Sequence, residues 1–164
     1  MKSQMKRLFT LALLSATVLG AQAQGKYQGE DRGRPVQPAQ VNTKWQQECG
    51  SCHMAFPPGL LPAASWRKTM AGLDKHFGAD ASLSPQDSTV ITDFLVKNAS
   101  NRWTASSVPL RITEAVWFKT KHNDKEIAPS VWKRAAVKSP SNCMACHAAA
   151  DKGDFDEKSI KILE

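Results

Sequence analysis

Apolar residues recur along the chain at helical spacing, and no stretch alternates between apolar and polar residues as a β-strand does. The clearest segment begins at Ser84, which is followed by proline at the first helical position and by an acid at the third. The apolar residues after it form one stripe: Val90, Ile91, Phe94 and Leu95. Lys97 and Asn98 close the segment, so the pattern predicts a helix from about residue 85 to 97.

Weaker helical patterns lie on both sides of this segment. We expect helices over the residues from Val41 into residue 49, over 62–78 with Gly78 as the stop, over 113–122, over 129–137, and over 142–153 behind a Ser139–Ser141 cap. Residues 99–111 look irregular and form the best boundary between two halves. The pattern therefore predicts a mostly α fold.

Two short motifs carry the chemistry of the chain. Residues 49–53 read Cys-Gly-Ser-Cys-His, and residues 143–147 read Cys-Met-Ala-Cys-His. The pattern C-x-x-C-H is typical of covalent c-type haem attachment, in which two thiols add to the porphyrin vinyl groups and the histidine binds the iron. All four cysteines, Cys49, Cys52, Cys143 and Cys146, belong to these motifs. The sequence thus predicts two covalently bound haem c groups.

Two other sites use paired cysteines. A thioredoxin-like dithiol needs a βαβ setting, whereas the flanks here are not strand-like. A zinc ribbon usually separates its cysteine pairs by about 15–20 residues, whereas 90 residues lie between Cys52 and Cys143. A zinc site also has no need of a histidine directly after each second cysteine. Both alternatives are weaker than haem attachment.

The first 23 residues resemble an export signal. Lys2, Lys6 and Arg7 precede a short apolar run from Leu8 to Leu19, and Ala21-Gln22-Ala23 is an A-x-A cleavage site. The run is shorter than the about 20 apolar residues of a membrane helix. We therefore expect a cleaved chain beginning near Gln24, located in the periplasm and not spanning the membrane.

The remaining 141 residues divide into an extended lead-in (24–40), a first haem-binding half (41–105) and a second haem-binding half (106–164). Their apolar content is modest, so much of the core should be porphyrin. We expect a small cytochrome-c-like helical fold packed around the two haems. Cleavage lowers the formal charge from +7 to +4 and the propionates lower it further. The scattered lysines do not indicate a nucleic-acid partner, although a basic patch for an acidic redox partner stays open.

Histidines account for the axial positions of both irons. His53 and His147 are proximal ligands by motif, and His76 and His122 are the only other histidines. Two six-coordinate irons need two distal ligands, so the count matches. Methionine is the rival ligand, but Met54 and Met144 lie too close to the motifs, and Met70 lies on the apolar face of a helix.

The spacing lets each half supply its own distal ligand. His76 lies 23 residues after His53, and His122 lies 25 residues before His147. A crossed arrangement, with His122 on the first haem, stays open at this stage.

The chain also resembles the dihaem cytochrome c family often called DHC. The similarity rests on residues along the whole mature chain: the first motif with Phe56–Pro62, Ser65-Trp66, Leu73–Gly78, Arg111–Thr113 through His122, Val131-Trp132, and Asn142–His147. The resemblance implies a periplasmic, mostly helical electron-transfer protein with two bis-histidine haems. It also implies a redox partner, either a small monohaem oxygen-binding cytochrome called the sphaeroides haem protein or a membrane cytochrome b.

An electron carrier with six-coordinate irons needs no catalytic residue, because electrons pass through exposed porphyrin edges. The competing class is a dihaem enzyme of peroxidase or oxygen-binding type, with one open haem. It would apply if His76 or His122 were not a ligand. A dithiol oxidoreductase is a third class. Our interpretation is a carrier and not an enzyme.

Overall fold

Helices and turns make up the secondary structure of the computed structural model, which describes residues 36–100 and 108–163. All of these residues belong to one unit, Arg32–Glu164. No strand occurs among them, and only two isolated bridges are present, Pro62 with Ser100 and His76 with Ala79. The predicted mostly α fold is confirmed. The elements are α1 (Thr43–Gly50), η1 (Pro58–Leu60), α2 (Ala63–Met70), η2 (Leu73–Lys75), α3 (Pro85–Lys97), η3 (Ile112–Glu114), α4 (Val116–Lys121), η4 (Val131–Lys133), η5 (Cys143–Ala145), η6 (Ala150–Lys152) and η7 (Glu157–Ser159).

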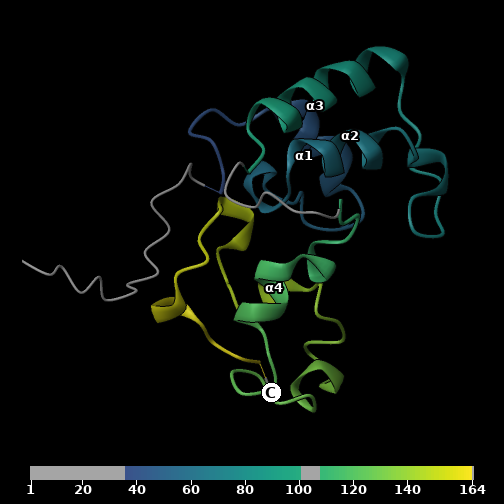
Figure 1. Ribbon diagram of the computed structural model, residues 1–164. Helices are drawn as coiled ribbons and strands as arrows, with labels where there is room; N and C mark the ends of the chain where they lie inside the picture. Colours follow the sequence, from purple (N-terminus) through teal and green to yellow (C-terminus); the bar gives the residue numbers. More distant parts are fainter. Residues whose placement is uncertain (1–35, 101–107, 164) are drawn as a thin grey trace, which may run out of the picture. The chain divides into compact units, whose positions relative to one another are not determined.

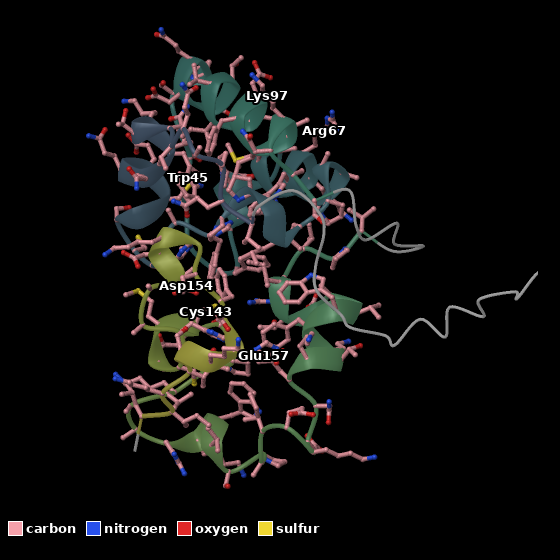
Figure 2. All side chains as sticks on the ribbon, turned by 90° about the vertical axis from the view of Figure 1, so that its left-hand side faces the viewer. Trp45, Arg67, Lys97, Cys143, Asp154 and Glu157 are labelled. Carbon is pink, nitrogen blue, oxygen red and sulfur yellow. The ribbon has the colours of Figure 1, made fainter. Side chains whose placement is uncertain are left out.

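The first three α-helices pack together, as Figure 1 shows. Their buried faces meet in one cluster made of Trp45, Leu61, Trp66, Met70, Ile91, Leu95 and Ala99. Each helix contributes because its apolar residues recur every three or four positions and so share one side. Figure 2 marks Trp45 of this cluster, whose ring centroid lies 5.3 Å from that of Phe94.

The helix start at Ser84 is confirmed. The Ser84 hydroxyl accepts a hydrogen bond from the Asp87 amide at 3.1 Å and donates one to the Asp87 carboxylate at 2.9 Å. Pro85 is the first helical residue, and the helix ends at Lys97. One detail differs from the prediction: Val90 is 44% exposed, whereas Ile91 and Leu95 are buried. The buried face of α3 is therefore narrower than the sequence stripe.

The helix predicted over residues 62–78 is shorter in the structure. It ends at Met70, and after Ala71 and Gly72 the chain forms the separate turn η2. Phe77 and Gly78 both have positive φ, of 52° and 102°. A backbone with positive φ cannot continue a right-handed helix. The chain therefore turns sharply at His76, which lies at the end of η2 rather than in α2.

The second half contains much less regular helix than the sequence predicts. Among residues 108–163, only α4 is an α-helix, and it begins at Val116 because Ala115 is extended. The helices predicted over 129–137 and 142–153 are single 3-10 turns, η4, η5 and η6. The buried cluster is also small, consisting of Val131, Val137 and Ala145. With so few apolar positions, this part of the chain lacks the continuous face that stabilises a long helix.

Several sequence predictions concern residues beyond those described. The export signal, residues 1–23, and most of the lead-in lie outside them, and so does the proposed boundary near residue 105. The division into two halves stays a prediction. Among the described residues, no helix has the length and apolarity that crossing a bilayer requires.

Candidate functional site: two histidine pairs beside two cysteine motifs

The first cysteine motif begins in the last turn of α1 and ends in the turn after it. Cys49 is partly buried against the first cluster, whereas Cys52 and His53 are exposed. Asn42 caps α1 by accepting a hydrogen bond from the Trp45 amide at 2.9 Å. Trp45 is buried, and it therefore fixes the helix that presents Cys49.

The second motif lies on η5 instead of a longer helix. The Cys143 carbonyl accepts hydrogen bonds from the Cys146 amide at 3.1 Å and from the His147 amide at 2.8 Å. The C-terminal segment runs beside it, and the Lys161 amide donates to the Cys146 carbonyl at 3.0 Å. Cys143 is marked in Figure 2. The motif is thus held by turn hydrogen bonds and by the C-terminal segment, and not by a continuous helix.

No disulfide joins any of the four cysteines, all of which lie in the described part of the chain. Burial, with a smaller contribution from the charge of Glu48, raises the pKa of the Cys49 thiol to about 11. Burial also raises the pKa of Cys143 to about 11. In the described part of the chain, no group of three or more His, Cys, Asp or Glu side chains is arranged to hold a metal ion, so the zinc alternative gains no support.

The four histidines form two pairs, one in each half. The ring centroids of His53 and His76 lie 6.2 Å apart, and those of His122 and His147 lie 6.3 Å apart. Two imidazoles bound to opposite sides of one metal ion, each through a nitrogen at about 2.0–2.1 Å, place their centroids about 6.3 Å apart. Both pairs thus have the spacing that a haem iron between them requires. The pairing is within each half, not crossed.

The two distal candidates, His76 and His122, both lie at the end of a helical element. His76 follows η2 and His122 follows α4. Burial lowers the pKa of His76, and the nearby His53 and Arg111 lower it further. Burial also lowers the pKa of His122 and of His147. A lowered pKa favours the neutral imidazole, which is the form that binds a metal ion.

Hydrogen bonds fix the tautomer of one histidine in each pair. The Nδ1 atom of His53 lies 2.7 Å from the Met54 carbonyl oxygen, and that of His122 lies 3.0 Å from the Phe118 carbonyl oxygen. A carbonyl only accepts, so Nδ1 donates in both cases and Nε2 keeps its lone pair for a metal. The Nδ1 atom of His147 is buried without a partner.

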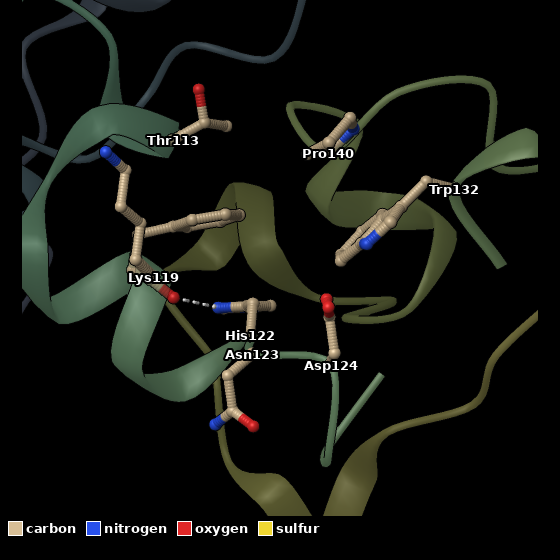
Figure 3. A pocket seen from close by; sticks show the side chains of 8 residues that line it. Thr113, Lys119, His122, Asn123, Asp124, Trp132 and Pro140 are labelled. Atoms are coloured by element: carbon tan, nitrogen blue, oxygen red, sulfur yellow. Dashed lines mark hydrogen bonds between the residues drawn. The ribbon is translucent and has the colours of Figure 1, made fainter. Parts of the chain in front are cut away.

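Aromatic side chains surround the second pair and line a pocket beside it. This pocket has a volume of about 440 Å³, and Figure 3 shows His122 from the end of α4 and Trp132 from η4 on its walls. The centroids of these two rings are 6.3 Å apart. The ring of Phe118 stacks on His122, and Phe155 lies 5.3 Å from His147. The aromatic rings on this wall suit a flat porphyrin face, and they stand beside polar side chains that include Lys119, Asn123 and Asp124.

A second pocket, of about 300 Å³, is lined by both cysteine motifs. Cys52 and His53 come from the first motif, Met54 follows it directly, and Cys143 and Met144 come from the second motif. The two attachment sites, 90 residues apart in the sequence, therefore open onto one space.

The structure brings the four histidines into two pairs, His53 with His76 and His122 with His147. The rival ligand Met70 does not belong to either pair. Met70 is buried in the first cluster with Trp66 and Ile91. Sequence reasoning gave no role to Phe118 or to Arg111. The spacing of four residues between Phe118 and His122 indicates a shared helix face. Arg111 lies 3.9 Å above the ring of Phe77, beside His76, and no sequence signal pointed to that contact.

The chain is similar to proteins of one known family. The sequence profile of the dihaem cytochrome c family matches residues 45–155. A dihaem cytochrome c from Rhodobacter sphaeroides is 43% identical, with a TM-score of 0.65, over 70% of this chain and 97% of that one. A dihaem c-type cytochrome from Shewanella baltica is 41% identical, also with a TM-score of 0.65, over 74% of this chain and 92% of that one. No curated protein matches the chain.

Proposed function

The chain belongs to the dihaem cytochrome c family, and from this premise we propose that it carries electrons between redox proteins through two haems with two histidine ligands each. Membership of this family implies that the chain carries two covalently bound c-type haems. The observation that carries the proposal is the spacing of the histidine pairs, 6.2 Å and 6.3 Å between ring centroids.

Each haem site has its own set of residues in this proposal. Cys49 and Cys52 attach the first haem, and His53 and His76 bind its iron. Cys143 and Cys146 attach the second haem, and His147 and His122 bind its iron. Two histidines fill both axial positions, so neither iron keeps a site for substrate.

The bound haems supply one-electron chemistry. The chain positions the groups and sets the balance between ferric and ferrous iron. Histidine ligation favours ferric iron more than a methionine ligand would. Hydrogen bonds from His53 and His122 to backbone carbonyls increase the basicity of the imidazoles and act in the same direction. The pocket lined by both motifs brings the two attachment sites close together, which supports electron transfer within the chain.

Export and the redox partner are part of the same proposal. We place the mature protein in the periplasm, because residues 1–23 have the pattern of a cleaved signal. N-terminal sequencing of exported protein should find Gln24 first, whereas an intact Met1 would contradict cleavage. We propose a monohaem oxygen-binding cytochrome or a membrane cytochrome b as partner. Stopped-flow mixing with each would show which one exchanges electrons with the reduced protein.

The ligand assignment can be tested by optical and EPR spectroscopy of the matured protein. Unsubstituted protein should contain two covalent haems and only low-spin ferric iron. His76→Ala should convert the first haem to a high-spin form that binds carbon monoxide, and His122→Ala should do so for the second. Met70→Leu is the matched control and should leave both haems low-spin. Cys143→Ala combined with Cys146→Ala should give a one-haem protein by mass spectrometry.

Two results would contradict the proposal. If neither histidine substitution changes the spin state, the distal ligands are wrong. If unsubstituted protein already contains a high-spin iron that binds carbon monoxide or peroxide, the carrier function fails and a dihaem enzyme with one open haem takes its place.

A further inference from the structure

The two histidine pairs differ in the angle between their ring planes. His53 and His76 are close to parallel, with an interplanar angle of 28°. His122 and His147 are close to perpendicular, with an angle of 69°. Because the spacing of the two pairs is nearly the same, this angle is the main geometric difference between the two iron sites.

Phe118 fixes the plane of His122 by two contacts. Its ring stacks on the imidazole with centroids 4.0 Å apart and an interplanar angle of 9°. Its backbone carbonyl accepts the Nδ1–H of the same imidazole at 3.0 Å, which Figure 3 shows as a dashed line. Phe118 is only 7% exposed, so its own ring is held by the surrounding chain. An imidazole held on its face and at one nitrogen cannot rotate freely about a bond to iron.

In the first pair the aromatic contacts are tilted rather than stacked: His53, whose Nδ1 donates to the Met54 carbonyl, has the ring of Phe56 at 4.9 Å with an interplanar angle of 33°. The ring of Phe77 lies 4.8 Å from that of His76 but is tilted by 57°. Phe77 is also 47% exposed, and its other face is covered by Arg111. His76 lies at the start of the turn at residues 76–79, where the Ala79 amide donates to the His76 carbonyl at 3.1 Å.

We propose that Phe118 is a positioning residue that holds His122 crossed relative to His147, and that it thereby makes the second haem electronically different from the first. This inference rests on the proposed bis-histidine ligation. Phe118 acts on the iron through the imidazole of His122, on which its ring stacks.

The physical reason lies in how imidazoles interact with iron d orbitals. Each ring donates π density from an orbital perpendicular to its plane. Parallel rings act on the same iron orbital and split the two dπ levels, which stabilises ferric iron because it has one dπ electron fewer. Crossed rings act on one level each, so the splitting and that stabilisation are lost. This effect raises the potential of the second haem relative to the first, and it makes the ferric EPR signal of the second haem strongly anisotropic.

The test uses EPR of the complete, matured protein in the ferric state. Unsubstituted protein should give two different low-spin signals, one rhombic and one highly anisotropic. The one-haem protein with Cys143→Ala and Cys146→Ala should keep only the rhombic signal. Phe118→Leu removes the stacked ring but keeps the backbone carbonyl. It should shift the anisotropic signal toward the rhombic type and lower the potential of that haem in a redox titration.

A matched control and a conservative variant complete the test. Phe94→Leu removes a ring that contacts Trp45 and no histidine, so it should leave both signals in place. Phe118→Tyr keeps the stacked ring and should retain the anisotropic signal. Two similar rhombic signals in unsubstituted protein would overturn the inference while leaving bis-histidine ligation intact. An unchanged anisotropic signal in Phe118→Leu would overturn the role of Phe118. A high-spin signal in unsubstituted protein would instead overturn the proposed function.

Discussion

At the scale of single residues, Gly59 in η1 allows the chain at Val36, in the lead-in, to pack directly against it. Its amide donates to the Val36 carbonyl at 2.8 Å. A Cβ atom at Gly59 would lie 2.6 Å from that oxygen and 2.7 Å from the Val36 Cα atom. Both neighbours are backbone atoms, so they cannot move aside as the end of a flexible side chain could. Only glycine permits this close approach.

Gly59→Ala should therefore destabilise the protein. The added methyl group forces the Val36 backbone away, and we expect the free energy of unfolding to fall by about 1–3 kcal/mol, as for other overpacked positions. Guanidinium unfolding of the haem-loaded protein measures it. Gly72→Ala is the matched control, because the nearest atom to its Cβ would be 3.7 Å away. Equal stability of the two variants would refute the steric argument.

Trp66 is a second residue at which a single substitution tests a specific contact. Its indole Nε1 donates to the Pro58 carbonyl at 2.7 Å within the core, which ties α2 to η1. Trp66→Phe removes this bond. The Leu61 amide still donates to the same carbonyl at 3.5 Å, so the carbonyl is not left without a donor. We expect a loss of about 0.5–1.5 kcal/mol for the hydrogen bond, with a further loss from the smaller ring, measured by thermal unfolding. A variant as stable as the parent would show that the bond contributes nothing.

At the scale of elements, α3 depends on its N-terminal cap. Ser84→Ala removes the oxygen that accepts from the Asp87 amide, and loss of such a cap costs about 1 kcal/mol. Denaturant unfolding should show this decrease with both haem spectra unchanged. Ser88→Ala, within the same helix, is the control and should have a smaller effect. If the two substitutions cost the same, the cap is not what stabilises the start of α3.

The elements also show which parts of the fold were predictable. The start and end of α3 and the course of α1 follow from local signals that act within one turn, and they were predicted correctly. The break after Met70 was missed because it occurs at Ala71 and Gly72, where Gly72 leaves helical geometry with φ of −124° and ψ of 28°, and apolar spacing does not encode such a change. The turns η4, η5 and η6 were predicted as helices because the sequence contains capping residues and prolines at suitable positions. The sequence does not show how few buried apolar contacts these segments make in the fold.

The same contrast holds for the candidate site. The cysteine motifs and the number of histidines can be read directly from the sequence, and so all four histidines were named as candidate iron ligands. Their pairing was not, because separations of 23 and 25 residues allow either arrangement. The stacking of Phe118 on His122 follows from helical spacing only once α4 is known to extend to residue 121. Ring angles depend on packing around each imidazole and have no local sequence signal.

At the scale of the whole molecule, residues 36–100 and residues 108–163 are stabilised differently. Residues 36–100 contain a cluster of seven buried residues, five of them in α1, α2 and α3, whereas the cluster in residues 108–163 has three residues and most elements there are single turns. Regions with few buried apolar contacts open at lower free energy. In the haem-loaded protein, amides of residues 123–153 should therefore exchange with solvent faster than those of α2 and α3. Hydrogen exchange followed by mass spectrometry measures this, and equal protection of the two regions would contradict it.

This uneven distribution of the core also bears on how the protein is made. A chain that crosses a membrane N-terminus first presents α1, α2 and α3 before the second motif emerges. Those helices contain their own buried cluster, so they can fold while the rest of the chain is still in transit. The second motif lies on a single turn rather than on a longer helix. Its histidine pair is complete only after His147, which emerges later than His122, has crossed the membrane. Assembly should therefore run from the first haem to the second, and partly matured molecules should carry their single haem on Cys49 and Cys52.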